Sequence, residues 1–143
     1  MRSNTKILFS IPYVDNDIPF WKKLNHLYAQ HIKEVYFPLI DARIGSGRPK
    51  QPAKYLLKFL ESGIFPVSLL INPIVLPYKV EDISEQILGK IHKLSAQFNL
   101  VDITLTNPIL AGIIKKHFPK ISLTASTLLE ICTSQQLVML GNV

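Results

Sequence analysis

Hydrophobic residues along the chain follow two patterns: short continuous apolar runs, and longer segments in which apolar residues recur every three or four positions. The first pattern is typical of strands buried in a parallel sheet, and the second is typical of the helices that cover such a sheet. The pattern predicts five strands, at residues 6–13, 34–40, 65–71, 100–106 and 121–125. It predicts helices at residues 18–33, 52–62 and 81–98, a short helix from 108, and a last helix at 128–140. The chain therefore reads as five successive strand-helix units.

Two of the predicted helices carry an apolar stripe on one face. In the helix at 81–98 the stripe consists of Ile83, Ile87, Ile91, Leu94 and Phe98. In the first helix it consists of Trp21, Leu24, Leu27, Tyr28 and Ile32. Residues at this spacing lie on the same side of a helix, so we expect both stripes, aromatic residues included, to belong to the core.

A short internal repeat supports the unit structure. The sequence LINPIV at residues 70–75 returns as LTNPIL at 105–110, thirty-five positions later, which is about the length of one strand-helix unit. In the second copy we expect Asn107 to cap a helix whose first residue is Pro108, because proline lacks only an N–H that would be unpaired there. In the first copy Pro77 follows closely, so Asn72 and Pro73 are expected to open a loop.

Two α/β folds agree with parallel strands that alternate with helices. One is a TIM-like (β/α) barrel, of which about five units would be present and the remainder missing, since a barrel needs eight. The other is a five-stranded doubly wound open sheet. The sequence reads as interrupted after Gly141. We therefore expect residues 1–143 to form either a single α/β domain or the N-terminal part of a larger barrel.

Composition agrees with one globular core. The 143 residues are 48% hydrophobic and 18% charged. The sequence contains neither an apolar run of about 18 residues nor a signal peptide, so we expect a cytoplasmic protein without a membrane partner. Cys132 is the one cysteine. It suits a reducing compartment, and we expect it as a buried thiol inside the last helix.

The net charge of +6 raises the question of an anionic partner. Lys and Arg are spread along the chain, and no recognition motif accompanies them. Nucleic-acid binding is therefore only weakly supported by the sequence. The four histidines show no pair at the four-residue spacing of helical metal ligands, and no histidine groups with the cysteine. The sequence therefore predicts no metal site.

Polar residues follow the predicted strands where ligands bind in both candidate folds, at the carboxyl ends. The candidate substrate-binding residues are Asn72, Asn107, Ser126, Thr127 and, from the GSGRP loop, Arg48. Structural roles compete with binding. Thr127 and Glu130 match the capping-box pattern, which does not use Ser126. The loop that carries Arg48 is interpreted first as a simple connection between elements, and as an anion-binding loop second.

The segment LVDITLTNPILAGIIKKHFPKISLTASTLLEICTSQQLVMLG, together with IKEVYFPL at residues 32–39, resembles the N-terminal region of the peptidase U32 family. The most specific part is TAST, residues 124–127, with the preceding Phe118-Pro119. The resemblance implies a barrel-like fold whose N-terminal half is present here. The family is named for collagenase-like proteolysis, and several members act in hydroxylation of RNA or quinone precursors with iron–sulfur clusters. Ser126 and Thr127 correspond to a polar strand end of the family.

The expected function is the substrate-binding rim of a U32-like barrel protein, for a small-molecule or peptide substrate. The chain alone is expected to be inactive, and its catalytic residues are unknown. Cys132 matches no cluster motif, so an iron–sulfur cofactor is expected only if further cysteines lie downstream. The alternative is a non-enzymatic α/β module for an anionic small molecule or a partner protein. A homodimer is expected if the chain is complete, because five barrel strands leave both sheet edges open.

Overall fold

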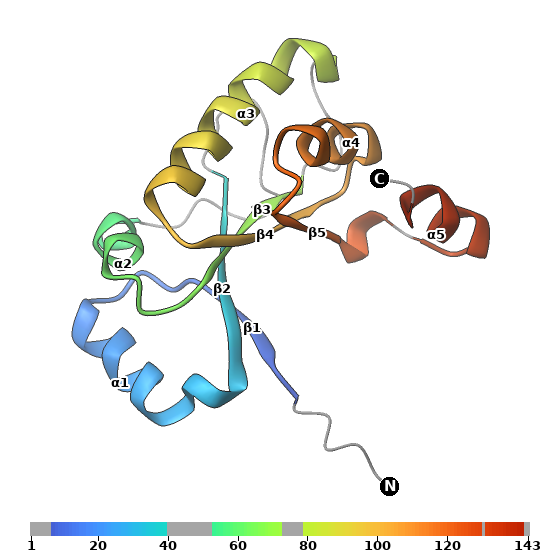
Figure 1. The fold of residues 1–143 in the computed structure, drawn as a ribbon. Coiled ribbons are helices and arrows are strands. Elements are labelled where there is room, and N and C mark those ends of the chain that lie inside the picture. Colours follow the sequence, from blue (N-terminus) through green and yellow to red (C-terminus); the bar gives the residue numbers. More distant parts are fainter. Residues whose placement is uncertain (1–6, 40–52, 73–78, 130, 142–143) are drawn as a thin grey trace, which may run out of the picture.

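A computed structural model of the chain describes residues 7–39, 53–72, 79–129 and 131–141 (Figure 1). The loop that carries Arg48 lies outside the described residues. Five strands form one sheet, in the order in which they occur in the chain, and every neighbouring pair is parallel. The strands are β1 (Phe9–Pro12), β2 (Ile32–Pro38), β3 (Val67–Ile71), β4 (Leu100–Leu105) and β5 (Ser122–Ala125).

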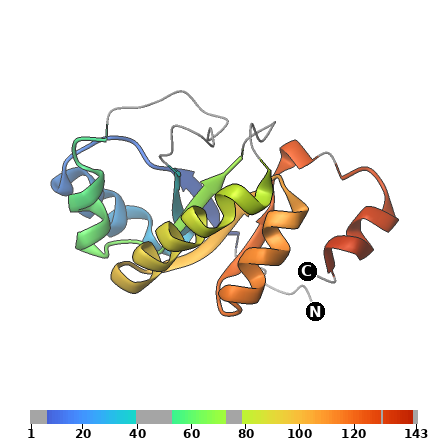
Figure 2. The ribbon, with the colours of Figure 1, turned by 90° about the horizontal axis from the view of Figure 1, so that it is seen from above.

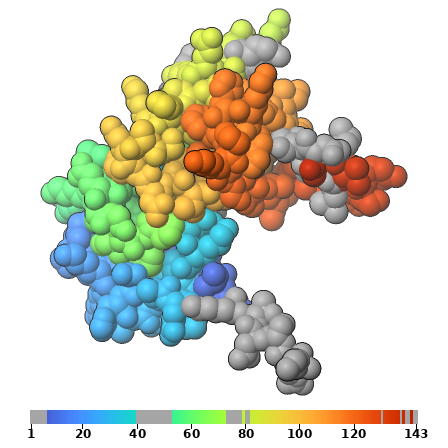
Figure 3. Space-filling view, in the orientation of Figure 1, coloured from blue at the N-terminus to red at the C-terminus, as the bar shows by residue number. Residues whose placement is uncertain are grey.

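The helices follow the strands one by one. They are α1 (Ile18–Tyr28), α2 (Leu56–Ser62), α3 (Val80–Gln97), α4 (Pro108–His117) and α5 (Ser134–Gly141), with short 3-10 turns η1 (Ala29–His31) and η2 (Thr127–Leu129). Helices α1 to α4 cover one face of the sheet (Figures 1 and 2). Helix α5 stands apart from them beyond β5 (Figure 3).

The parallel α/β fold expected from the sequence is confirmed. The sheet is open, as in the doubly wound alternative, whereas its sequential strand order is that of successive barrel units. A closed barrel stays a prediction. None of the described helices is long and apolar enough to cross a membrane.

The core lies between the sheet and helices α1 to α4. Trp21 is fully buried, and its ring packs against those of Tyr13 and Phe59 at centroid distances of 5.6 and 4.4 Å. The predicted stripe of α3 is confirmed, since Ile83, Ile87 and Ile91 are buried and the rest of the stripe packs against them. Helix α2 ends at Ser62, and the following Gly63 caps it in the left-handed conformation with a positive φ of 58°.

The first predicted helix was too long. Helix α1 ends at Tyr28, and Ile32 already adopts an extended backbone conformation as the first residue of β2. Leu27 and Tyr28 are half-exposed, so their placement in the core was wrong, whereas Ile32 packs against the core from the strand. Pairing of Ile32 with Phe9 of β1 is a long-range contact, and it overrides the helical period at this point.

The last helix begins later than expected, and its cap is a different one. Gln136 Oε1 accepts hydrogen bonds from the backbone N–H groups of Cys132 at 2.7 Å and Thr133 at 3.0 Å, and Thr133 Oγ1 accepts from Gln136 N at 3.2 Å. This is a capping box at the start of α5. Thr127, where the sequence predicted the box, is instead the first residue of η2, and its expected partner Glu130 lies outside the described residues. Cys132 lies before α5 and is exposed, which corrects its expected burial inside the helix.

Candidate functional site

The sheet has a second face, opposite the helices, and that face is polar. Side chains alternate between the two faces of a strand, so the neighbours of core residues point away from the helices. We call this surface the polar face. Its polar members are Ser10, Glu34, Tyr36, Ser68, Asn72, Asp102, Thr104, Ser122, Thr124 and Ser126, and Leu70 lies among them. The strand register places Tyr36, Ser68, Asp102 and Ser122 in one row across four strands.

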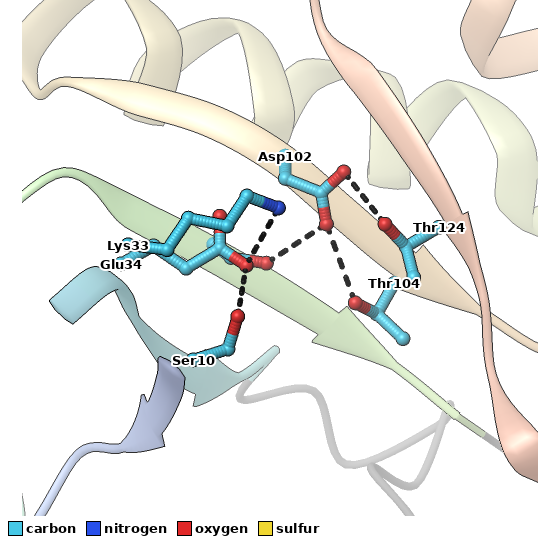
Figure 4. Close-up of polar contacts among 7 residues, drawn as sticks. Ser10, Lys33, Glu34, Asp102, Thr104 and Thr124 are labelled. Carbon is cyan, nitrogen blue, oxygen red and sulfur yellow. Dashed lines mark hydrogen bonds and ion pairs between the residues drawn. The ribbon is translucent and has the colours of Figure 1, made fainter. Parts of the chain in front are cut away.

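Asp102 is the centre of a hydroxyl cluster (Figure 4). It is only 1% exposed. Its carboxyl oxygens accept hydrogen bonds from Ser68 at 3.3 Å, Thr104 at 3.4 Å and Thr124 at 3.0 Å. These donors come from β3, β4 and β5, so one carboxyl group ties three strands together. A buried carboxyl group needs such donors, because its desolvation would otherwise be uncompensated.

Glu34 is the second buried acidic residue of the polar face, at 4% exposed. Its Oε1 accepts a hydrogen bond from Ser10 Oγ at 2.8 Å and lies 3.5 Å from the half-exposed Lys33 Nζ (Figure 4). Its Oε2 is also buried, and no described residue donates a hydrogen bond to it. Glu34 therefore keeps one acceptor atom unused by the described part of the chain.

Asn72 and Ser126 meet at the carboxyl end of the sheet. The two residues are 54 positions apart in the chain, and Asn72 Nδ2 donates to Ser126 Oγ at 3.0 Å. Ser126 Oγ also accepts from Leu128 N at 3.3 Å, so Ser126, and not Thr127, holds the turn that follows β5. Asn72 Oδ1 is buried, and within the described ranges it has no hydrogen-bond donor.

These groups surround an open cavity of about 290 Å³ on the polar face. Its lining residues are Ser10, Lys33, Glu34, Tyr36, Ser68, Leu70, Asn72, Thr104, Thr124, Ala125, Ser126 and Thr127. Two unused acceptor atoms thus belong to residues of one cavity. The arrangement can hold a molecule that donates hydrogen bonds.

The residues expected at the rim from the sequence separate into three groups. Asn72, Ser126 and Thr127 come together at this cavity, where Thr127 is exposed. Asn107 caps α4 as expected, since its side chain accepts from Leu110 N at 2.9 Å, and it lines a different cavity of about 280 Å³ between α4 and β5. Arg48 cannot be assigned to either, because it lies outside the described residues.

Most residues of the polar face were not predicted from the sequence, and the three buried ones among them are Glu34, Ser68 and Asp102. Ser68 is the one polar residue of VSLLI, Asp102 shares LVDITL with Thr104, and Glu34 follows Lys33 in IKEVYFP. In a parallel sheet with both faces covered such positions are normally apolar. Their polarity was the signal that one face of this sheet has a different role.

A further polar cluster, at the end of β1, is structural. Asp15 accepts hydrogen bonds from Tyr13 Oη at 2.8 Å and from the backbone N–H groups of Lys54 at 3.1 Å and Tyr55 at 2.9 Å, just before α2. The Tyr55 N–H bond is the main reason why the pKa of Asp15 is below its usual value. Burial, and then the hydrogen bond and charge of Asp15, raise the pKa of Tyr13 well above its usual value.

Comparisons of the chain with family models, with curated proteins and with solved structures found no match. Within the described ranges no three or more His, Cys, Asp or Glu residues are grouped so as to hold a metal ion. The polar face and its cavity are therefore the basis of the functional proposal.

Proposed function

We propose that the polar face binds a small polar molecule, and that the chain supplies the substrate-binding side of a U32-like protein. One observation carries the proposal: Glu34 Oε2 and Asn72 Oδ1 are buried without a described donor, and both residues line one cavity. A buried acceptor without a partner costs about 1–3 kcal/mol. A ligand that donates hydrogen bonds to both atoms would recover that loss, which favours its binding.

The resemblance to the U32 family supports the place of the site. It assigned Ser126 and Thr127 to a polar strand end, and both residues line the cavity. A row of parallel strands with helices on one face is also what a barrel-type protein would contribute. In this proposal the chain binds the substrate, and residues that would react with it belong to other parts of a complete site.

The second candidate function is a non-enzymatic α/β binding module that uses the same cavity. It differs in needing no further catalytic residues. The anionic ligand first expected for such a module relied on Arg48, whereas the described lining residues include the carboxyl group of Glu34 and two threonine hydroxyl groups that donate to Asp102 behind them. A cytoplasmic location agrees with both candidates, because an exposed lone thiol such as Cys132 persists in a reducing compartment.

The proposal can be tested by thermal unfolding in the presence of a panel of small polar compounds, with and without the Asn72→Leu substitution. Compounds that occupy the cavity should raise the melting temperature of the wild type. Asn99→Leu is the matched control, because Asn99 is exposed at the opposite end of the sheet, just before β4. The stabilisation should persist in N99L and disappear in N72L.

Two outcomes would contradict the proposal. In the first, no compound of the panel stabilises the wild type. In the second, N72L is stabilised as strongly as N99L, which would place the bound compounds elsewhere on the protein.

A further inference from the structure

Four hydroxyl groups of the polar face offer a ligand acceptors and no donors. A serine or threonine hydroxyl has a single hydrogen. Ser68, Thr104 and Thr124 use theirs toward Asp102, and Ser10 uses its hydrogen toward Glu34. What these hydroxyl groups still present to a ligand are oxygen lone pairs. At these four positions the acidic residues Glu34 and Asp102 therefore decide what the cavity wall presents.

Glu34 has an acceptor that the described residues leave open. Ser10 and Lys33 both approach Oε1, whereas Oε2 is buried and receives no bond from the described part of the chain. A buried carboxylate oxygen is best satisfied by a cationic donor, because charge-assisted hydrogen bonds are shorter and stronger than neutral ones. Asn72 lines the same cavity, and its Oδ1 can accept a hydrogen bond from an O–H or N–H group.

We propose that the ligand of this cavity is a small aliphatic amine in its protonated form, and this inference rests on the proposed function. Its ammonium group is directed to the carboxyl group of Glu34, and a second donor group of the same molecule is directed to the side-chain amide of Asn72. The volume of about 290 Å³ is just below the usual range for ligand cavities, roughly 300–1,000 Å³, so the molecule is small.

Lys33 is the charged group that competes with such a ligand. Its Nζ lies 3.5 Å from Glu34 Oε1, and its side chain is 49% exposed and lines the cavity, so it is the counter-ion of Glu34 there. A cationic ligand is repelled by Lys33, whereas an anionic ligand is attracted by it. Removal of this charge therefore distinguishes the two ligand classes by the sign of its effect.

The test uses three four-carbon probes of equal length: 1,4-diaminobutane, 1,4-butanediol and succinate. Each is titrated into the full chain while backbone amide chemical shifts are followed by NMR. The diamine should shift the amides of Glu34, Ser68 and Asn72 at the lowest concentration, the diol should do so more weakly, and succinate should leave them in place. The order follows from the charge on the group that faces Glu34 Oε2.

Two variants complete the test. Glu34→Gln keeps the shape of the side chain and removes its charge. It should lower the affinity for the diamine by about tenfold and leave the affinity for the diol almost unchanged. Lys33→Met should raise the affinity for the diamine. This substitution alters a half-exposed side chain and so keeps the test valid even if E34Q folds poorly.

The outcomes separate this inference from the proposed function. If the diol or succinate shifts the same amides at least as strongly as the diamine, or if K33M weakens the diamine, the cavity binds polar ligands but not cations, and only the inference is overturned. If none of the probes shifts these amides, even at the highest concentrations that leave the protein folded, both the inference and the proposed binding of a small polar molecule fail.

Discussion

At the scale of single residues, two aspartates show how an acidic side chain organises this fold. Asp15 accepts hydrogen bonds from Tyr13 and from the backbone just before α2, and it thereby connects segments about 40 residues apart. Asp102 accepts hydrogen bonds from three hydroxyl groups on the polar face, and each bond stabilises the fold by about 1 kcal/mol. The first fixes the position of a helix, and the second orients groups that line a cavity.

Tyr13 leads to a prediction about alkaline pH. Its pKa is raised in the folded protein by burial and by Asp15, so the folded protein keeps the phenol proton while the unfolded chain loses it above the usual value of 10.0. The unfolded state then binds fewer protons than the native state, and stability falls as the pH rises through this range. Tyr13→Phe should show a smaller decline. Urea unfolding followed by Trp21 fluorescence at several pH values measures it.

Tyr28→Phe is the matched control for this prediction, because Tyr28 is half-exposed and the same atom is removed. Its alkaline decline should equal that of the wild type. If the curves of the wild type and Y13F run parallel above pH 10, burial of Tyr13 does not control the alkaline stability.

At the scale of elements, local signals placed most helices, but their ends depended on competing caps. Asn107 and Pro108 were identified as the start of α4 because the cap and the proline act within one turn. For the last helix the sequence offers two capping boxes six residues apart, at Thr127 and at Thr133. The structure uses the second, because Ser126 already holds the 3-10 turn after β5.

The cap of α4 gives a second prediction. Asn107→Ala removes the acceptor of Leu110 N and should lower the free energy of unfolding by about 1 kcal/mol, whereas Asn107→Asp keeps an acceptor and should be close to wild type. Binding of probes to the polar face should not change in either variant, since Asn107 lines the other cavity. Chemical unfolding and an NMR titration measure the two effects.

This pair of variants also decides between capping and substrate binding at Asn107. Loss of probe binding in N107A, with stability unchanged, would assign Asn107 to the ligand and would contradict its role as a cap.

At the scale of the whole molecule, the sheet has two outer edges. Within the described residues no strand pairs with the outer side of β1 or β5. Next to the first edge the chain exposes apolar side chains, with Phe9 of β1 56% exposed. An unpaired strand edge with exposed apolar residues is a surface on which a second copy can add a strand.

We therefore expect self-association that increases with protein concentration. Phe9→Lys should reduce it, because a charge on an edge strand opposes pairing. Leu57→Lys is the control: Leu57 is 59% exposed on α2, away from the edge, and its substitution should leave association unchanged. Sedimentation equilibrium measures the association. A wild-type protein that stays monomeric at every concentration, or an L57K variant that dissociates like F9K, would contradict the role of β1.

The α/β class, the alternation of strands and helices, the stripe of α3 and the cap of α4 could all be predicted from the sequence. These follow from periodicity and from interactions within a few residues, which a single sequence shows directly. It also placed Asn72 and Ser126 at strand ends, and the parallel sheet brings them into contact because its carboxyl ends share one edge.

The residues of the strands that form a site could be identified only in the folded structure. Glu34, Ser68 and Asp102 lie on different strands, and their proximity depends on register and on helices that cover one face and leave the other polar. The end of α1 also depends on a tertiary contact, because pairing of β2 with β1 outweighs the helical period at Ile32. Hydrogen bonds between strands tens of residues apart leave no mark in local spacing, so the acceptor-lined cavity appears only in the folded chain.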